Sequence, residues 1–165
     1  MIASPLRVAT APDASAIAAV INAAFEVERF FVEGSRTNVD EILEYMRKGM
    51  FLVAEGGGGI TGCVYVEPQG ERGYFGLLAV EPREKGRGLG RLMVAAAEDD
   101  LRRAGCQVVD IRVVDLRTEL VPFYRRLGYE ETGTEPFPTQ TRRPCHFIRM
   151  SKVLAAAPAT PATPA

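Results

Sequence analysis

Three glycines alternate with larger residues in one short, basic stretch of this chain. The stretch reads Lys85, Gly86, Arg87, Gly88, Leu89, Gly90, Arg91. Glycine lacks a Cβ and adopts positive φ without strain, so consecutive backbone N–H groups can converge on one point. Basic side chains beside those groups add positive charge. The chemistry predicted for this stretch is therefore the binding of an anion, above all a phosphate or a pyrophosphate.

A strand must lead into this turn and a helix must follow it. Residues 77–80 are a short apolar run that stops before Pro82, which is typical of a strand buried on both faces. From Leu89 onward, apolar residues recur at helical spacing until Gly105 ends the helix. The unpaired N–H groups of the helix start, at the positive end of its dipole, then point into the turn.

The spacing of the glycines excludes two familiar phosphate motifs. A P-loop needs a glycine followed directly by lysine and then serine or threonine, and no glycine of this chain is followed by these two residues. The dinucleotide fingerprint Gly-x-Gly-x-x-Gly, started at Gly86, would need glycine where Arg91 stands. Residues 56–59 are four glycines without a following lysine, serine or helix start, so they are predicted to be a flexible hairpin turn. For residues 85–91 the alternative is an ordinary glycine-rich turn with solvated basic side chains.

A short helix around an aromatic pair is predicted later in the chain. Phe123 and Tyr124 follow Pro122, which suits the beginning of a helix. Gly128 ends the helix, and Tyr129 comes directly after it.

These two stretches together resemble the signatures of the GNAT superfamily of N-acetyltransferases. The pattern Lys85-x-x-Gly88-x-Gly90 is similar to the Arg/Gln-x-x-Gly-x-Gly/Ala turn that grips the pyrophosphate of acetyl-coenzyme A, with lysine at the first position. Residues 123–129 are similar to the aromatic-Tyr-x-x-x-Gly-aromatic run of the superfamily. The two signatures come in the order of the superfamily, and the resemblance spans residues 6–154.

The resemblance implies that acetyl-CoA is the cosubstrate and that its acetyl group passes directly to a primary amine in a ternary complex. Tyr124 is then the general acid for the leaving thiolate, because a phenol pKa of ~10 and a thiol pKa of ~8.5 are close enough for proton transfer. A packed tyrosine with a satisfied hydroxyl is the alternative. Backbone N–H near Leu78 or Ala79 holds the oxyanion, and the pantetheine arm lies between that strand and the one around residues 111–113. The residues expected to bind acetyl-CoA are Leu78, Ala79, Val80, Lys85, Gly86, Arg87, Gly88, Leu89, Gly90 and Arg91.

The general base is not evident from the sequence. Many members of the superfamily carry a glutamate on the strand before the turn, where residues 74–77 here read Tyr-Phe-Gly-Leu. Gly76 could instead leave room for the acceptor. Arg117 stands where the superfamily often has asparagine, seven residues before the tyrosine. Either the amine arrives partly neutral, or a carboxylate acts directly or through water, and the candidates are Glu26, Glu28, Asp115 and Glu119.

The acceptor is expected to bind beside the segment that follows the first helix, since the resemblance places this segment at the acceptor side of the cleft. The pocket candidates there are Phe25, Phe30, Phe31 and Arg36. The alternative is an ordinary connection whose aromatic residues fill the core. A small-molecule amine is the favoured acceptor. A protein or peptide N-acetyltransferase, a non-catalytic acyl-CoA sensor and a dinucleotide-binding protein stay open as alternatives.

The fold class predicted for residues 1–154 is a single α/β domain of the GNAT type. Its mixed, mostly antiparallel central sheet has six to seven strands and is flanked by about four helices. The predicted strands are residues 6–9, 51–54, 60–67, 74–80, 108–114, 130–135 and 145–152. Residues 155–165 form an Ala/Pro/Thr-rich tail, a composition that predicts disorder.

Composition excludes several functional classes. The formal net charge of −1 gives no general attraction for nucleic acid. The single histidine, His146, argues against a histidine-based metal centre, and Cys63, Cys106 and Cys145 are too far apart for metal-ligand spacing and are interpreted as reduced core residues. No metal is predicted. Neither a secretion signal nor an apolar run of membrane-spanning length is present, so a cytoplasmic protein is expected, with a homodimer left open.

Overall fold

The structure is a computed structural model that describes residues 6–154. The tail predicted for residues 155–165 lies outside the described residues. The described chain forms one seven-stranded mixed sheet in the order β1-β2-β3-β4-β5-β7-β6. Its strands are β1 (Arg7–Val8), β2 (Met50–Gly56), β3 (Gly59–Gln69), β4 (Arg72–Val80), β5 (Val108–Val114), β6 (Glu130–Pro136) and β7 (His146–Val153). All neighbours pair antiparallel except β4 and β5, which confirms the predicted mixed, mostly antiparallel sheet.

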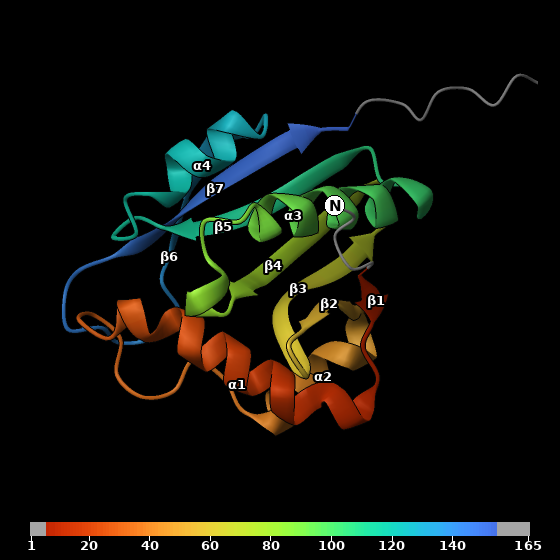
Figure 1. Ribbon diagram of the computed structural model, residues 1–165. Coiled ribbons are helices and arrows are strands. Elements are labelled where there is room, and N and C mark those ends of the chain that lie inside the picture. The colour runs from red at the N-terminus through yellow and green to blue at the C-terminus, as the bar shows by residue number, and fades with distance from the viewer. Residues whose placement is uncertain (1–5, 155–165) are drawn as a thin grey trace, which may run out of the picture.

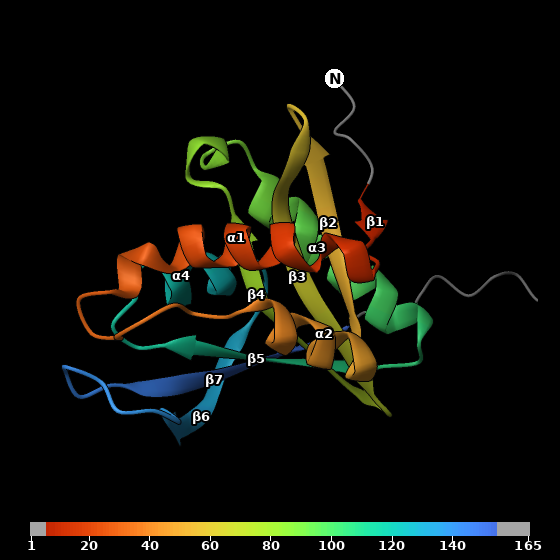
Figure 2. The same cartoon turned by 90° about the horizontal axis from the view of Figure 1, so that it is seen from below.

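Four helices lie against the two faces of the sheet, as predicted (Figure 1). They are α1 (Ala14–Ala24), α2 (Val39–Lys48), α3 (Leu89–Arg103) and α4 (Leu120–Arg126). Figure 2 shows α1 and α2 across β2, β3 and β4, on the face opposite to α3 and α4. The same view shows β5, β7 and β6 without a helix on the α1 side. One half of that face of the sheet is therefore left open.

Two apolar cores result from the alternation of side chains along the strands. On β3, Val64 and Val66 face the core of α3 and α4, while Cys63 and Tyr65 face the core of α1 and α2. Both cores share β2, β3 and β4, whereas β5 and β7 contribute only to the core of α3 and α4.

The sheet divides where β4 and β5 separate. The two strands form three parallel pairs, and the last of them joins Tyr74 to Asp110. Beyond that point β4 continues along β3 as far as Val80, while β5 continues along β7 as far as Val114. The carboxyl halves of these two strands therefore diverge (Figure 1).

Two details of the helix ends can be compared with the sequence. The sequence offers Asn38 or Asp40 as the cap of α2, and Asn38 is the cap, because its side chain accepts a hydrogen bond from the Glu41 N–H at 2.9 Å. Pro12 followed by Asp13 predicts Asp13 as the cap of α1, but its carboxylate instead accepts from the Thr10 N–H at 2.8 Å and from Arg7. The helix is preceded by a short 3₁₀ turn, so the cap lies one turn earlier than the pattern suggested.

The three cysteines agree only in part with expectation. All three cysteines are free, and Cys63 and Cys106 are buried, whereas Cys145 is partly exposed rather than part of the core. Within residues 6–154 no group of three or more His, Cys, Asp or Glu side chains is placed to hold a metal ion. None of the helices in this range is both long enough and apolar enough to span a bilayer.

A buried polar contact fastens α3 to the far half of the sheet. Glu98 on α3 accepts from Tyr129 Oη at 2.7 Å and from Lys152 Nζ at 3.1 Å. Replacing Glu98 by alanine leaves both donors without their acceptor, so we expect Glu98→Ala to lower the free energy of unfolding by about 1–3 kcal/mol in urea titrations. Asp99→Ala is the control, because this exposed neighbour pairs with Arg102 on the surface and should change stability by less than about 0.5 kcal/mol. Equal losses in the two variants would contradict a structural role for the buried contact.

Candidate active site

The basic turn adopts the open, glycine-dependent conformation that the sequence predicts. Gly86 and Gly88 have φ of 83° and 82°, in the left-handed region that favours glycine. A Cβ added to either residue would have no other heavy atom within 4 Å. The backbone conformation, rather than crowding, therefore requires glycine at these two positions, and the space beside the turn is free.

The start of α3 presents unpaired N–H groups to this space. The first backbone hydrogen bond of the helix runs from the Leu92 N–H to Gly88 O at 3.0 Å, so the N–H groups of residues 89–91 precede it. A Cβ at Gly90 would meet only Phe123 Cζ, at 3.8 Å. Residues 86–91 thus form an uncovered backbone cradle that fits a diphosphate.

Basic side chains surround the cradle without filling it. Lys85 and Arg91 are exposed and form no salt bridge with any carboxylate of the described residues. Arg87 is the exception, because its guanidinium lies 3.5 Å from a Glu84 oxygen. The side chains of Lys85 and Arg91 are therefore free to bind an anion, whereas Arg87 would have to leave Glu84 to do so.

The strand before the turn carries a β-bulge at the predicted oxyanion position. Tyr65 pairs with Gly76 and Cys63 with Ala79, so Leu77 and Leu78 together face one residue of β3. Leu77 has a φ of 51°, which is uncommon for a residue with a side chain. The bulge takes this backbone out of the regular register, while on its other side β4 has already left β5. Leu78, Ala79 and Val80 therefore line the opening between the two halves of the sheet.

Tyr124 lies at the same opening. Its side chain packs against Phe75, Phe123 and Tyr129, and the residue is only 7% exposed. The Tyr124 hydroxyl has no hydrogen-bond partner among residues 6–154, yet every fully buried polar side-chain atom in this range has one. The Tyr124 oxygen must therefore reach accessible space, which disfavours a packed tyrosine with a satisfied hydroxyl.

Burial sets the protonation state of Tyr124. The pKa of its phenol is raised above the usual value mainly by burial, further by the nearby Tyr74, and lowered in part by the positive charge of Arg117. The phenol is consequently protonated throughout the neutral range. Burial at this opening would also raise the pKa of a thiol bound there. The raised pKa of the phenol therefore does not prevent a proton transfer from Tyr124 to the thiolate.

The candidate bases occupy different environments. Glu26 is exposed beside Arg29, and Glu119 is exposed beside Arg117. The Asp115 carboxylate already accepts from the His146 N–H at 2.9 Å. Glu28 is the only one of the four that is buried.

The space over Gly76 is occupied by the chain itself. A Cβ added to Gly76 would collide with the hydroxyl of Tyr74, so the glycine leaves room for that tyrosine rather than directly for the acceptor. No role for Tyr74 was predicted from the sequence. The pattern that indicates one is that Tyr74 stands two residues before Gly76, so both residues lie on the same face of the strand.

Two loops meet over the segment that is predicted to frame the acceptor. The Arg142 N–H donates to Phe31 O at 2.8 Å, and Arg143 lies over the ring of Phe30 at 5.4 Å. Phe31 is 0% exposed and fills the core, as the alternative interpretation of this segment holds. Phe30 remains exposed, and Arg36 lies 5.4 Å above the ring of Phe25. Of the four pocket candidates, Phe31 is therefore a core residue.

The sequence profile of the acetyltransferase (GNAT) family matches residues 19–129, which is well over half of the chain. This chain belongs to the GNAT acetyltransferase family. Members of this family are acetyl-CoA-dependent N-acetyltransferases, and the matched range includes the basic turn and Tyr124.

Solved GNAT structures share the fold of this chain. A ribosomal-protein-alanine N-acetyltransferase from Brucella melitensis is 22% identical, with 91% of this chain and 99% of that chain covered and a TM-score of 0.76. A putative acetyltransferase from Salmonella typhimurium, solved with acetyl-CoA, is 21% identical, with coverages of 98% and 99% and a TM-score of 0.75. A phosphinothricin acetyltransferase from Sinorhizobium meliloti, in complex with acetyl-CoA, is 17% identical, with coverages of 96% and 92% and a TM-score of 0.77.

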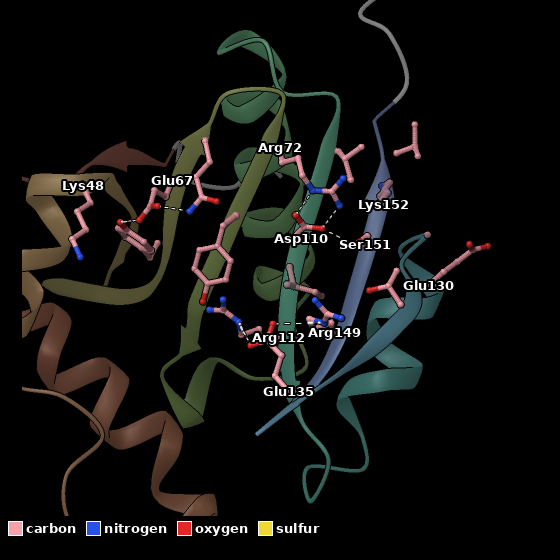
Figure 3. A pocket seen from close by; sticks show the side chains of 18 of the residues that line it. Lys48, Glu67, Arg72, Asp110, Arg112, Glu130, Glu135, Arg149, Ser151 and Lys152 are labelled. Carbon is pink, nitrogen blue, oxygen red and sulfur yellow. Dashed lines mark hydrogen bonds and ion pairs between the residues drawn. The ribbon is translucent and has the colours of Figure 1, made fainter. Parts of the chain in front are cut away.

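The GNAT sheet of this chain also forms a groove of about 1130 Å³ that the sequence did not predict. It lies on the face that α1 and α2 leave open, and Figure 3 shows side chains of β4, β5, β6 and β7 along it. Its charges are mostly paired: Asp110 accepts from Arg72 at 2.6 Å, and Glu135 accepts from Arg112 at 3.0 Å. Tyr74 is one of its lining residues.

Removal of the free positive charges should weaken coenzyme A binding. We expect the double variant Lys85→Ala, Arg91→Ala to raise the Kd for coenzyme A at least about tenfold, because one charged hydrogen bond contributes about 1.5 kcal/mol. Calorimetry at two salt concentrations measures this, and the salt dependence should fall as well. Arg83→Ala is the matched control, because Arg83 is exposed on the preceding turn and is held by Glu81 at 2.8 Å. An equal loss in Arg83→Ala would show that net charge alone matters, and an unchanged Kd in the double variant would place the diphosphate elsewhere.

Proposed function

We propose that this GNAT enzyme acetylates the primary amine of a small molecule, by direct transfer in a ternary complex. The observation that carries the proposal is the closure of the acceptor side by two loops. Besides the hydrogen bond between Arg142 and Phe31, the rings of Phe31 and Phe137 lie 6.5 Å apart edge to face, and Arg142 lies 3.4 Å from Glu33. An entrance covered in this way favours a compact acceptor over a folded protein surface.

The residues that hold the donor follow from the open backbone described above. Residues 86–91 and the side chains of Lys85 and Arg91 would bind the diphosphate. The unpaired edge of Leu78, Ala79 and Val80 would hold the extended arm through main-chain hydrogen bonds. Acetyl-CoA supplies the acetyl group as a thioester, which an amine can attack. The N–H groups of the β4 bulge would stabilise the oxygen that becomes negative during the attack.

Tyr124 would act as the general acid of the transfer. Its hydroxyl has no partner among residues 6–154 and reaches the opening between β4 and β5, while the rest of the ring is fixed by aromatic contacts. A proton at this position can pass to the leaving thiolate.

A peptide acceptor is the second candidate, and the long groove on the open face of the sheet favours it. Tyr74 lines the groove, which could seat residues that follow a free N-terminus. The Brucella melitensis enzyme named above acts on a ribosomal-protein alanine, whereas the Sinorhizobium meliloti enzyme is a phosphinothricin acetyltransferase. The family thus includes both kinds of acceptor.

An acceptor screen distinguishes these possibilities. Free amino acids, amino sugars, short diamines and peptides with a free N-terminus are incubated with acetyl-CoA, and thiol release is followed. We expect release with at least one of the small amines and a lower kcat/KM with peptides. Faster turnover of peptides would favour the second candidate. A protein that binds coenzyme A but shows no acceptor-dependent release would be a sensor rather than an enzyme.

The acid role of Tyr124 predicts a specific kinetic change. Tyr124→Phe should lower kcat by about 10²-fold or more while leaving the Kd for coenzyme A within twofold. Because burial raises the pKa of this phenol, wild-type activity should show no loss from its ionisation up to pH 10.

Tyr129→Phe is the matched control, since it removes the neighbouring hydroxyl that bonds to Glu98. This control should lose stability but retain kcat. A Tyr124→Phe variant with wild-type kcat would overturn the assignment.

A further inference from the structure

We infer that Glu28 is the general base that takes a proton from the acceptor's ammonium group, and that Arg117 is the positioning residue that fixes it. This inference rests on the proposed acetyltransferase function. It assigns a residue to the removal of the ammonium proton, the step for which the sequence offered four candidate carboxylates.

Glu28 is held at the acceptor side by a long-range ion pair. It ends the 3₁₀ turn that follows α1, Phe25–Glu28, and is 5% exposed. One of its oxygens, Oε2, accepts from Arg117 Nη1 at 3.0 Å. The Arg117 side chain, on the connection between β5 and α4, is itself only 12% exposed. Both partners of a nearly buried pair are thereby fixed in one geometry, because separating them would leave an uncompensated charge.

The second oxygen of Glu28 is available. No partner for Oε1 exists among residues 6–154, although every fully buried polar side-chain atom in this range has one. Oε1 therefore borders accessible space. Glu28 lines a cavity of about 40 Å³ together with Phe25 and Arg36, which is room for one small polar group such as an amine or a water.

Arg117 links this carboxylate to the proposed acid. Its guanidinium donates to Glu28 through Nη1 and to Glu119 through Nε, each at 3.0 Å. Glu119 directly precedes α4, the helix that carries Tyr124. The turn that holds Glu28 is thus tied to the beginning of the helix that carries the proposed acid.

The charges around Glu28 suit a base that works near neutral pH. Burial raises the pKa of Glu28 above its usual value, while Arg117 and Arg36 lower it and Glu119 raises it. The net direction is upward. A carboxylate with a raised pKa accepts a proton from an ammonium more readily than an ordinary one.

The proposed step balances as follows. Glu28 takes one proton from the ammonium, which breaks an N–H bond and leaves a neutral amine. The amine nitrogen forms a C–N bond with the thioester carbonyl, the C–S bond breaks, and the thiolate takes the Tyr124 proton. The phenolate regains a proton from the nitrogen, and the proton on Glu28 passes to solvent.

The test is the pH dependence of kcat/KM, measured by thiol release with the best amine from the acceptor screen. We expect Glu28→Gln to be about 10²-fold slower at pH 7, with the deficit shrinking toward pH 10 because the amine then loses its proton unaided. Glu28→Asp should retain part of the activity, and Arg117→Gln should move the acidic limb to higher pH, since the pKa of Glu28 rises when its cation is removed. The Kd for coenzyme A should remain within twofold in Glu28→Gln, which shows that the site is folded.

Glu44→Gln is the matched control, because Glu44 on α2 is an exposed carboxylate that is paired with Arg47 and has no part in the proposed site. It should keep the wild-type profile. A Glu28→Gln variant with a wild-type rate and an unchanged acidic limb would overturn the assignment while leaving the acetyltransferase proposal intact. Absence of amine-dependent release in the wild type would instead overturn the proposed function, and the role of Glu28 with it.

Discussion

The site depends on the point at which two parallel strands stop pairing. β5 follows β7 from Val108 to Val114, whereas β4 follows β3 as far as Val80. The strands share only the pairs up to Tyr74 and Asp110, so the sheet becomes two diverging halves. Backbone groups of β4 are left facing a gap, and buried backbone groups need partners. An extended ligand with its own amides can supply them, which is why a thioester arm suits this position.

The other parts of the site are arranged around that gap by short local connections. The bulge at Leu77 redirects the end of β4, and the glycine turn then carries the chain into α3. The first turn of α3 lies close to α4, as the approach of Phe123 to Gly90 shows. Tyr124 is therefore fixed beside the same opening, and Arg117, on the connection that leads into α4, pairs with Glu28 in the turn that follows α1.

The sequence predicted the features that local chemistry determines. Gly86 and Gly88 could be recognised because only glycine adopts their backbone conformation easily, and the cap by Asn38 follows a local rule as well. Contacts across the fold could not be predicted in this way. Glu28 and Arg117 are 89 residues apart, and nothing local connects them. The positive φ of Leu77 was also hidden, since leucine seldom adopts it and the surrounding sheet imposes it.

The most direct test of this account is a crystal structure of the protein with coenzyme A. The account predicts the diphosphate on the N–H groups of residues 86–91, the pantetheine arm between β4 and β5, and the sulfur within reach of Tyr124. Coenzyme A bound along the open groove, or a gap closed by pairing of β4 with β5 beyond Tyr74, would contradict it.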